Sequence, residues 1–511
     1  MGGIFDIRDL KPLAGPALIL AAVVLALANF MVVLDTTIAN VSVPNIAGGM
    51  AVSPSEGTWV ITSYSVAEAI TVPLTGWLAA RFGAIRVFCI AVASFGLCSA
   101  LCGIAPSLGM LVVFRIMQGL SGGPMMPLSQ TLMLRIFPPN QRAAAMGLWS
   151  MTAVTGPIVG PLLGGQICDN LSWPWVFYIN VPVAALIVFG AIRLLAGRDE
   201  PLVRRPVDFV GLGLLVLWVG ALQIMLDKGE EVDWFNSPLI VILAVIAAIG
   251  FVSFLIWELT IEDPIVNLRL FANRAFAACS GVMALTFGCF FASVVLLPLW
   301  LQTSMGYNAG WSGRAMAFQG VLAVTFSPIA AMMSRYVDPR RMVFFGVLTI
   351  AGVLAWRSTN TTDVTFMGVG LPQLVLGAGM PFFFIALNSI ALGTIPVEQT
   401  AAGSGLLNFL RTTAGAFAVS MTTTSWANAT SRARVELAGS MHADGPLSQM
   451  QAGGLSAAQA LGNLDRLVQQ QSVMLATNSV FLALSCFTAL AAFSIWLAPR
   501  PTGPIQAGGG H

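Results

Sequence analysis

The stretch that decides the fold is GLWSMTAVTGPIVGPLLGG, Gly147–Gly165, within an apolar run long enough to cross a bilayer. Three glycines recur at every fourth position, so on a helix they form one smooth stripe that a second helix can approach closely. They are Gly156, Gly160 and Gly164, and Pro157 and Pro161 form a second stripe beside them. Two interior prolines would break a helix in water, whereas in a membrane neighbouring helices can satisfy the freed carbonyls. The stretch therefore predicts a bent membrane helix, either movable or packed as a structural element.

The composition places the chain among polytopic membrane proteins. Of its 511 residues, 57% are hydrophobic and only 9% are charged, against roughly a quarter charged in a globular domain. A net charge of +2 does not suggest nucleic acid as a partner. The seven cysteines form no CxxC pair and are interpreted as small core residues. Both histidines, His442 and His511, lie in polar segments, which excludes a histidine-based metal or catalytic site inside the membrane.

Fourteen apolar runs of spanning length follow one another along the chain, which predicts an all-α membrane protein. They are residues 14–38, 57–79, 87–105, 108–133, 143–166, 174–195, 208–226, 238–257, 275–301, 314–334, 342–358, 365–392, 399–425 and 474–497. The predicted inner loops carry most of the loop arginines, whereas the short outer loops hold only Lys228 and Arg357. The positive-inside rule therefore predicts that both termini are cytoplasmic.

A weak internal repeat divides the chain into two halves. Pro73–Arg86, PLTGWLAARFGAIR, and Pro328–Arg341, PIAAMMSRYVDPRR, both run from a proline through small residues to a basic turn. Parallel repeats of this kind are expected of transporters built from two six-helix bundles. We predict an N-terminal bundle at 1–203, two additional linking helices at 204–263, a C-terminal bundle at 264–500 with a long outer loop at 428–472, and a tail at 501–511.

Charged residues inside the spans ask for an explanation, because each costs about 2.5–3.5 kcal/mol or more. Asp35 in the first span is either a proton-coupling carboxylate or a hydrogen-bonded structural aspartate. Glu68 in the second span is a second proton site, a group that attracts cationic drugs, or a protonated side chain bonded to another helix. Arg115 shares a helix face with Gln118 and needs an acidic or carbonyl partner, because a guanidinium does not shed its proton.

Arg411 in the thirteenth span shares a face with Ser404, Asn408 and Gly415, and this polar stripe is expected to line a cavity in the C-terminal half. Methionines and aromatics suit varied apolar ligands because they are polarizable and adaptable. For any single one of them, packed core or lipid contact is the alternative. The candidates for ligand contact are Met31, Trp149, Met151, Met316, Phe318 and Phe384.

The chain resembles the EmrB-type multidrug efflux permeases, the fourteen-span drug:proton antiporter branch of the major facilitator superfamily. The resemblance covers essentially the whole length. The segments that carry it are LDTTIANVSVPNIA (Leu34–Ala47), GTWVITSY (Gly57–Tyr64), FRIMQGLSGGPMMPLSQ (Phe114–Gln130), the glycine–proline stretch quoted above, which matches the fifth-span antiporter motif, and WPWVFYINVP (Trp173–Pro182). The resemblance implies that Asp35 lies near Arg115 and takes part in proton coupling. It also leaves Gly76, Arg81, Gly83 and Arg86 as gating residues of the inner loop.

One residue departs from the family pattern. The inner-loop motif usually carries an aspartate before its arginine, but Ala80 precedes Arg81 here. The charge-relay role of that aspartate therefore cannot be assigned to this chain.

The resemblance implies proton-driven export of hydrophobic toxic compounds across a bacterial inner membrane, without a cofactor. It also implies two partners, an EmrA-like periplasmic adaptor and a TolC-like outer-membrane channel. No GxxxxGK[ST] stretch supports ATP coupling. The alternatives are a narrow exporter of a metabolite or siderophore, a membrane-embedded enzyme and a scaffold or receptor. The lack of a G-x-S-x-G turn and of intramembrane histidine opposes the enzyme, and intramembrane charges oppose the scaffold.

The long outer loop contains a helix signal of its own. Ser456 and Gln459 form a capping-box pattern. Leu461, Leu464 and Val468 follow at spacings of three and four. The pattern predicts a short amphipathic helix running into the last span. It is either a docking surface for the adaptor or a lid on the permease's own outer face.

Overall fold

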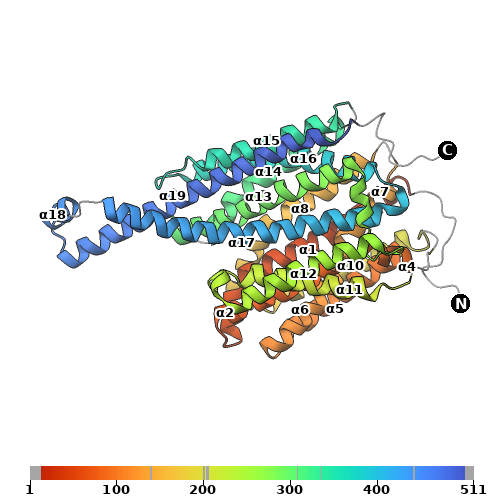
Figure 1. Ribbon diagram of the computed structural model, residues 1–511, viewed down its shortest axis with the longest axis horizontal. Coiled ribbons are helices and arrows are strands. Elements are labelled where there is room, and N and C mark those ends of the chain that lie inside the picture. Colours follow the sequence, from red (N-terminus) through yellow and green to blue (C-terminus); the bar gives the residue numbers. More distant parts are fainter. Residues whose placement is uncertain are drawn as a thin grey trace.

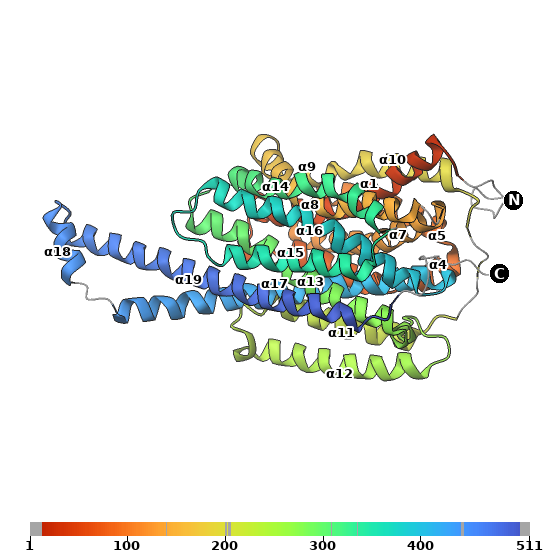
Figure 2. The same cartoon turned by 90° about the horizontal axis from the view of Figure 1, so that it is seen from above.

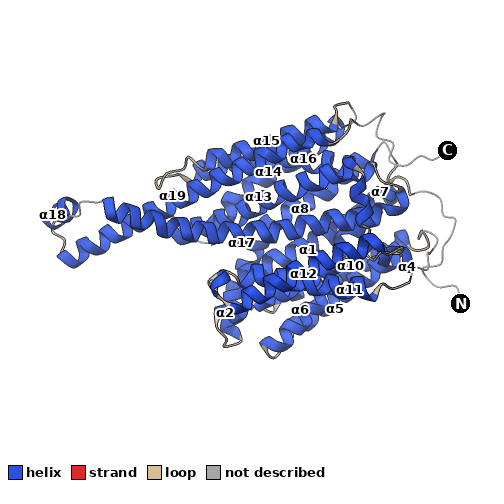
Figure 3. Cartoon of the chain, in the orientation of Figure 1, coloured by secondary structure: helices blue, strands red, loops and turns tan. Residues whose placement is uncertain are grey.

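The computed structural model describes residues 13–138, 141–199, 202, 206–307, 309–334, 336–440 and 444–500. These residues form helices and loops and no strand, as Figure 3 shows. The predicted all-α class is therefore confirmed. The boundary predicted at residues 203–204 and the predicted tail at 501–511 lie outside the described residues.

The helices follow the chain in three groups. The N-terminal half contains α1 (Pro16–Gly49), α2 (Pro54–Gly57), α3 (Trp59–Thr71), α4 (Thr75–Phe82), α5 (Ala84–Gly103), α6 (Leu108–Gly122), α7 (Met125–Ile136), α8 (Arg142–Asn170), α9 (Trp175–Tyr178) and α10 (Asn180–Leu195). The additional pair is α11 (Phe209–Lys228) and α12 (Pro238–Thr260), with η2 (Trp234–Asn236) between them. The C-terminal half contains η3 (Leu268–Ala272), α13 (Arg274–Ser304), α14 (Ala309–Met333), α15 (Pro339–Arg357), α16 (Phe366–Gly393), η4 (Val397–Gln399), α17 (Thr400–Ser440), α18 (Asp444–Ala452), α19 (Ala457–Ser494) and η5 (Ile495–Leu497).

Each predicted apolar run corresponds to a helix or to a pair of consecutive helices. Within the described ranges, ten helices are long and apolar enough to cross a membrane. The remaining runs correspond to α8, to α17 and to two divided spans. One span divides into α3 and α4 around Pro73, and the other into α6 and α7 at Gly123 and Pro124. A proline has no amide hydrogen to donate, which explains why helical hydrogen bonding is interrupted there.

The glycine stripe of α8 packs against α1. A Cβ added to Gly160 would lie 2.6 Å from the Cβ of Thr37, and one added to Gly156 would lie 2.8 Å from the Cβ of Val33. Thr37 also donates a hydrogen bond to the carbonyl of Gly156 at 3.3 Å. The stripe thus faces a neighbouring helix, and α8 continues unbroken through both prolines. The side chains of Pro157 and Pro161 lie outside the described part of the structure.

The two halves meet closely at one end of the bundle, which we call the basic end because Arg81, Arg135 and Arg340 lie at its helix ends. Figure 1 shows α4 and α7 at this end, on the right. The backbones approach where a Cβ on Gly76 would lie 2.6 Å from the Cα of Ala402. Such an approach leaves no room for a passage between α4 and α17.

At the opposite end, which we call the hairpin end, α17 and α19 extend beyond the other helices (Figures 1 and 2). The predicted capping box is confirmed, since Ser456 accepts from the amide of Gln459, whose side chain accepts from the amide of Ser456. The helix that begins there runs without a break into the last span, as expected. The predicted loop differs in its first part, because α17 continues as a helix to Ser440. An ion pair of 2.7 Å between Arg434 and Asp465 joins the two arms.

Candidate functional site

A buried ion pair lies in the core of the N-terminal half. Arg115 on α6 donates from Nη1 to Oδ2 of Asp35 on α1 at 2.7 Å, and both side chains are fully buried. The second carboxylate oxygen accepts from Gln118 at 3.0 Å and from Asn180 on α10 at 2.7 Å. Side chains of two helices, α6 and α10, therefore bind one carboxylate of α1.

The guanidinium of Arg115 is held from several sides. Its Nε donates to the carbonyl of Val60 at 3.0 Å, and its centre lies 4.2 Å from the ring centroid of Tyr64 and 5.6 Å from that of Phe177. In the buried interior, breaking such a pair by removing one partner costs about 3–5 kcal/mol. A proton on Asp35 would cancel its charge and release Arg115 from this attraction, so protonation changes which contacts between α1 and α6 are favourable.

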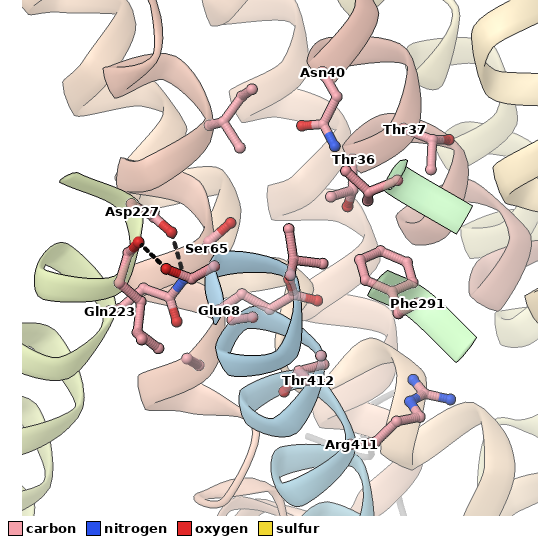
Figure 4. Close-up of a pocket in the computed structure, with 18 of the residues that line it drawn as sticks. Thr36, Thr37, Asn40, Ser65, Glu68, Gln223, Asp227, Phe291, Arg411 and Thr412 are labelled. Carbon is pink, nitrogen blue, oxygen red and sulfur yellow. Dashed lines mark hydrogen bonds between the residues drawn. The ribbon is translucent and has the colours of Figure 1, made fainter. Parts of the chain in front are cut away.

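A cavity of about 510 Å³ lies between the two halves, and its lining extends toward the hairpin end as far as Thr58, Glu230 and Thr423. It contains carboxylates, hydroxyls and amides on the N-terminal side and aromatic rings on the C-terminal side (Figure 4). Gln223 and Asp227 of the additional helix α11 are part of this wall and are hydrogen-bonded at 3.1 Å. The lining residues that the argument uses are Thr36, Thr37, Asn40, Glu68, Asp227, Glu230, Phe287, Phe291, Phe384 and Arg411.

Arg411 is the cationic side chain among those that line the cavity. It is 4% exposed, and its guanidinium lies 5.1 Å from the ring centroid of Phe287 and 5.9 Å from that of Trp149. Its Nη2 contacts the Sδ of Met126. Its Nε has no hydrogen-bond partner among the described residues. A buried guanidinium without a bonded carboxylate is able to bind an anionic or acceptor group of a ligand.

Three of the predicted ligand and coupling residues, Glu68, Phe384 and Arg411, line the cavity together. The other predicted contact residues lie elsewhere. Met31 and Met316 are buried in the core. Trp149 donates to Ser129 at 2.9 Å, and Phe318 packs on Phe366 at 5.9 Å between centroids.

Met151 lines a separate pocket between α8 and α14. Gln118 belongs to the ion-pair network, as described above.

Asn408 joins the halves at the basic end. Gln130 on α7 accepts from Ser404 at 2.6 Å and from Asn408 at 3.1 Å, and donates to Asn388 on α16 at 2.8 Å. We call these four residues the closure cluster. All four are buried, and their hydrogen bonds join the two halves between the cavity and the basic end.

The inner-loop residues surround a tight turn at the basic end. Gly83 has a φ of +91°, a conformation that favours glycine. Arg81 lies over Trp77, 5.3 Å from its ring centroid. The turn holds Asp199, which accepts from the amide of Ile85 at 2.8 Å. Burial raises the pKa of Asp199, opposed by hydrogen bonds from the amides of Ile85 and Arg86.

Sequence reasoning missed several residues of the site. Asp199 follows α10 and places a carboxylate beside the turn at Gly83. Ala80, just before this turn, stands where the family pattern has an aspartate. Gln130 and Asn388 are polar residues within apolar runs, which was a usable signal. Asp227, near the end of α11, also lines the cavity.

Comparison with known proteins identifies the class. The chain matches the model of the Major Facilitator Superfamily over residues 25–419. It is 42% identical over 507 residues to the multidrug export protein EmrB of Escherichia coli, covering 98% of this chain and 99% of that protein. It is 41% identical over 511 residues to the fatty acid resistance protein FarB of Neisseria gonorrhoeae, with 98% and 100% coverage.

A solved structure of the proton:xylose symporter XylE has the same fold, with a TM-score of 0.59 at 14% identity over 94% of this chain and 96% of that one. The chain therefore belongs to the Major Facilitator Superfamily, in the family of the EmrB multidrug export proteins. It is a multi-pass membrane transporter.

Proposed function

We propose that this protein is a proton-coupled antiporter that exports lipophilic toxic compounds across the bacterial inner membrane, with both termini cytoplasmic. Its relatives' names support export of drugs. The observation that supports the coupling is the buried Asp35–Arg115 pair, whose Asp35 is adjacent in sequence to Thr36, a residue that lines the cavity. Proton binding at Asp35 would loosen the pair and reset the packing of α1 against its neighbours.

The arrangement corresponds to one stage of alternating access. The closure cluster and the contact of Gly76 with Ala402 close the basic end, while the lining of the cavity extends toward the hairpin end. The arginines at the basic end support a cytoplasmic location of that end. In this stage, cargo would leave toward the periplasm and a proton would enter.

The cavity supports lipophilic cations as the first cargo class. Glu68, Asp227 and Glu230 give its wall an excess of carboxylates over the single guanidinium of Arg411. Phenylalanine rings provide apolar surface and can bind a cation through their faces. Lipophilic acids are a second class, favoured by the buried Arg411 and by the name of FarB.

Uptake into inverted membrane vesicles tests this proposal. We expect a fluorescent lipophilic cation to accumulate only when a proton gradient, acid inside, is imposed, and added cargo to release protons in proteoliposomes. A long-chain fatty acid should compete if both classes share the cavity. Equal uptake after collapse of the gradient would contradict antiport, and uptake limited to one metabolite or siderophore would favour the narrow exporter.

We further propose that the arms of α17 and α19 beyond the bundle dock a periplasmic adaptor, EmrA-like, which leads to a TolC-like channel. The arms project from the bundle in Figure 2, which favours docking over a lid. They also carry exposed apolar side chains, with Val435 73% and Leu461 60% exposed.

Deletion of residues 457–470 tests the docking proposal. We expect the deletion to leave proton-driven transport in vesicles intact and to remove resistance in whole cells. The double variant Val435→Asp and Leu461→Asp should do the same without shortening the chain. Equal loss in both assays would favour the lid, and no loss in either would mean that the arms are dispensable.

A further inference from the structure

A polar pocket of about 470 Å³ lies between α17 and α19, and we call it the arm pocket. Two charged residues, Arg432 and Glu436, line it together with the hydroxyl and amide side chains of Ser425, Asn428 and Ser479. We propose that the arm pocket binds the head group of a phospholipid that carries both a phosphate and an ammonium group, such as phosphatidylethanolamine.

The two charged side chains of the arm pocket have no counter-charge of their own. Arg432 and Glu436 stand about one helical turn apart on α17, and both residues are exposed. Within the described residues, no ion pair joins either of them to another side chain. Arg434, which lies between them in the chain, is instead paired with Asp465. A zwitterionic head group supplies both missing charges, because a guanidinium binds a phosphate and a carboxylate binds an ammonium.

Helix length places the arm pocket at the surface of the bilayer. About 20 helical residues span the hydrocarbon core, which is about 30 Å thick. Counted from Ser494, where α19 ends at the basic end, this length reaches Leu475, which lines the pocket. Beside Leu475, Thr477 accepts a hydrogen bond from the indole of Trp426 at 2.9 Å. Tryptophan is enriched where the hydrocarbon core meets the head groups.

The surface on both sides of this level fits a lipid that lies along the helices. Toward the basic end, exposed apolar side chains follow the pocket on both helices, namely Met421 and Phe417 on α17 and Leu482 on α19. These side chains suit the acyl chains. Side chains of a helix are tilted toward its N-terminus, which for α17 lies at the basic end. The side chains of Arg432 and Glu436 are therefore tilted toward the bilayer.

The acidic residue of the arm pocket selects between phospholipids. A lipid with a phosphate but no ammonium group would satisfy Arg432 and place a second negative charge near Glu436. The arm pocket and the central cavity share no lining residue. The proposal therefore does not depend on the proposed export.

Site-specific photo-cross-linking tests the proposal on the full-length protein in lipid nanodiscs. Leu475→p-benzoylphenylalanine places a photoreactive side chain in the wall of the arm pocket. The nanodiscs contain equal amounts of phosphatidylethanolamine and phosphatidylglycerol and a small fraction of diacylglycerol, all with the same acyl chains. Mass spectrometry of the cross-linked peptide gives the yield per mole of each lipid. We expect phosphatidylethanolamine to exceed phosphatidylglycerol about threefold, because an ion pair near the surface contributes modestly, and diacylglycerol to give the lowest yield.

Removing one charge at a time tests each contact in the cross-linking protein. Glu436→Gln should abolish the preference for phosphatidylethanolamine over phosphatidylglycerol. Arg432→Gln should lower both phospholipids about threefold relative to diacylglycerol, because both carry the phosphate. Arg466→Gln is the matched control, since it removes the same charge from an exposed position of α19 that does not line the pocket, and it should change neither ratio. Monodisperse elution of each variant controls for folding.

The outcomes that would overturn the proposal are distinct. Equal yields of the two phospholipids, or a preference that survives Glu436→Gln, would exclude recognition of the ammonium group. Phospholipid yields that Arg432→Gln leaves unchanged would exclude the phosphate site. The same cross-linker in whole cells detects a competing occupant, because a protein adduct in place of lipid adducts would assign the pocket to a polypeptide.

Discussion

Arg115 of the N-terminal half and Arg411 of the C-terminal half are both buried, but their partners differ. Arg115 in the N-terminal half has a carboxylate, an amide, a carbonyl and an aromatic ring as partners, and only its Nη2 lacks a hydrogen-bond partner among the described residues. Arg411 in the C-terminal half has aromatic rings and a methionine sulfur, and its Nε has no partner among the described residues. It faces the cavity, whereas Arg115 does not.

The difference separates two tasks. A buried ion pair can act as a switch, because a proton on Asp35 would cancel the charge that holds Arg115. An unsatisfied cation in a cavity contributes binding, because a ligand can supply the missing partner. We propose that the ion pair of the N-terminal half responds to protons and that Arg411 of the C-terminal half contacts an anionic or acceptor group of the cargo. The predictions that follow test this division.

The variant Asp35→Asn should abolish gradient-driven transport, because an amide cannot carry the proton. The measurement is vesicle uptake, with thermal unfolding as the control for folding. The substitution leaves Arg115 without a counter-charge, so the double variant with Arg115→Gln should regain thermal stability but no transport. Transport by either variant would contradict a coupling role for Asp35.

Gly160→Leu should reduce transport at least tenfold, because a side chain there would overlap Thr37 on α1 and hold the helices apart. Gly165→Leu on the same helix is the matched control, since nothing lies within 4 Å of a Cβ at that position. The comparison uses uptake per unit of folded protein. Similar activity of both variants would mean that the α1–α8 contact does not move during transport.

Replacement of each arginine by glutamine compares the halves directly. Arg115→Gln leaves Asp35 buried without its cation and should destabilise the protein by about 3–5 kcal/mol. Arg411→Gln removes a buried charge that has no carboxylate within ion-pair distance among the described residues, so the loss of stability should be smaller than that of Arg115→Gln. Thermal unfolding measures both. An equal loss of stability would remove the distinction drawn between the two arginines.

Gln130→Ala should weaken the closure of the basic end, because it removes three hydrogen bonds between the halves, each contributing about 0.5–1.5 kcal/mol. We expect the distance distribution between spin labels placed on α4 and α17 at the basic end to gain a longer component. Ser129→Ala beside it, whose partner Trp149 lies in the same half, is the control. An unchanged distribution would show that other contacts suffice to close this end.

Glu68→Gln should give the smallest effect, about a threefold loss for lipophilic cations with neutral compounds unaffected, because it removes one of several carboxylates of the cavity wall. Uptake of a matched cationic and neutral pair measures this. Loss of both would make Glu68 a proton site rather than a cation-attracting group.

The sequence alone determined the helical class, the fourteen runs and the capping box at Ser456, because each depends on local composition or periodicity. It also placed Asp35 and Arg115 through the family resemblance. The period of a helix tells which residues share a face, but not which helix covers that face. For that reason Met31 and Trp149 could be predicted as ligand contacts although the structure packs them in the core.

Only the tertiary structure brought together residues far apart in the chain. Gln130 bonds Asn388 across 258 positions, and the cavity combines α1, α3, α11, α13 and α17. Asp199 lies beside the inner-loop turn although it is 114 positions from Ile85. Whether a buried polar group is satisfied depends on what packs against it, and packing is a property of the assembled helices. Arg115 has a bonded carboxylate, whereas Arg411 has none among the described residues, and this difference was therefore decided by the fold.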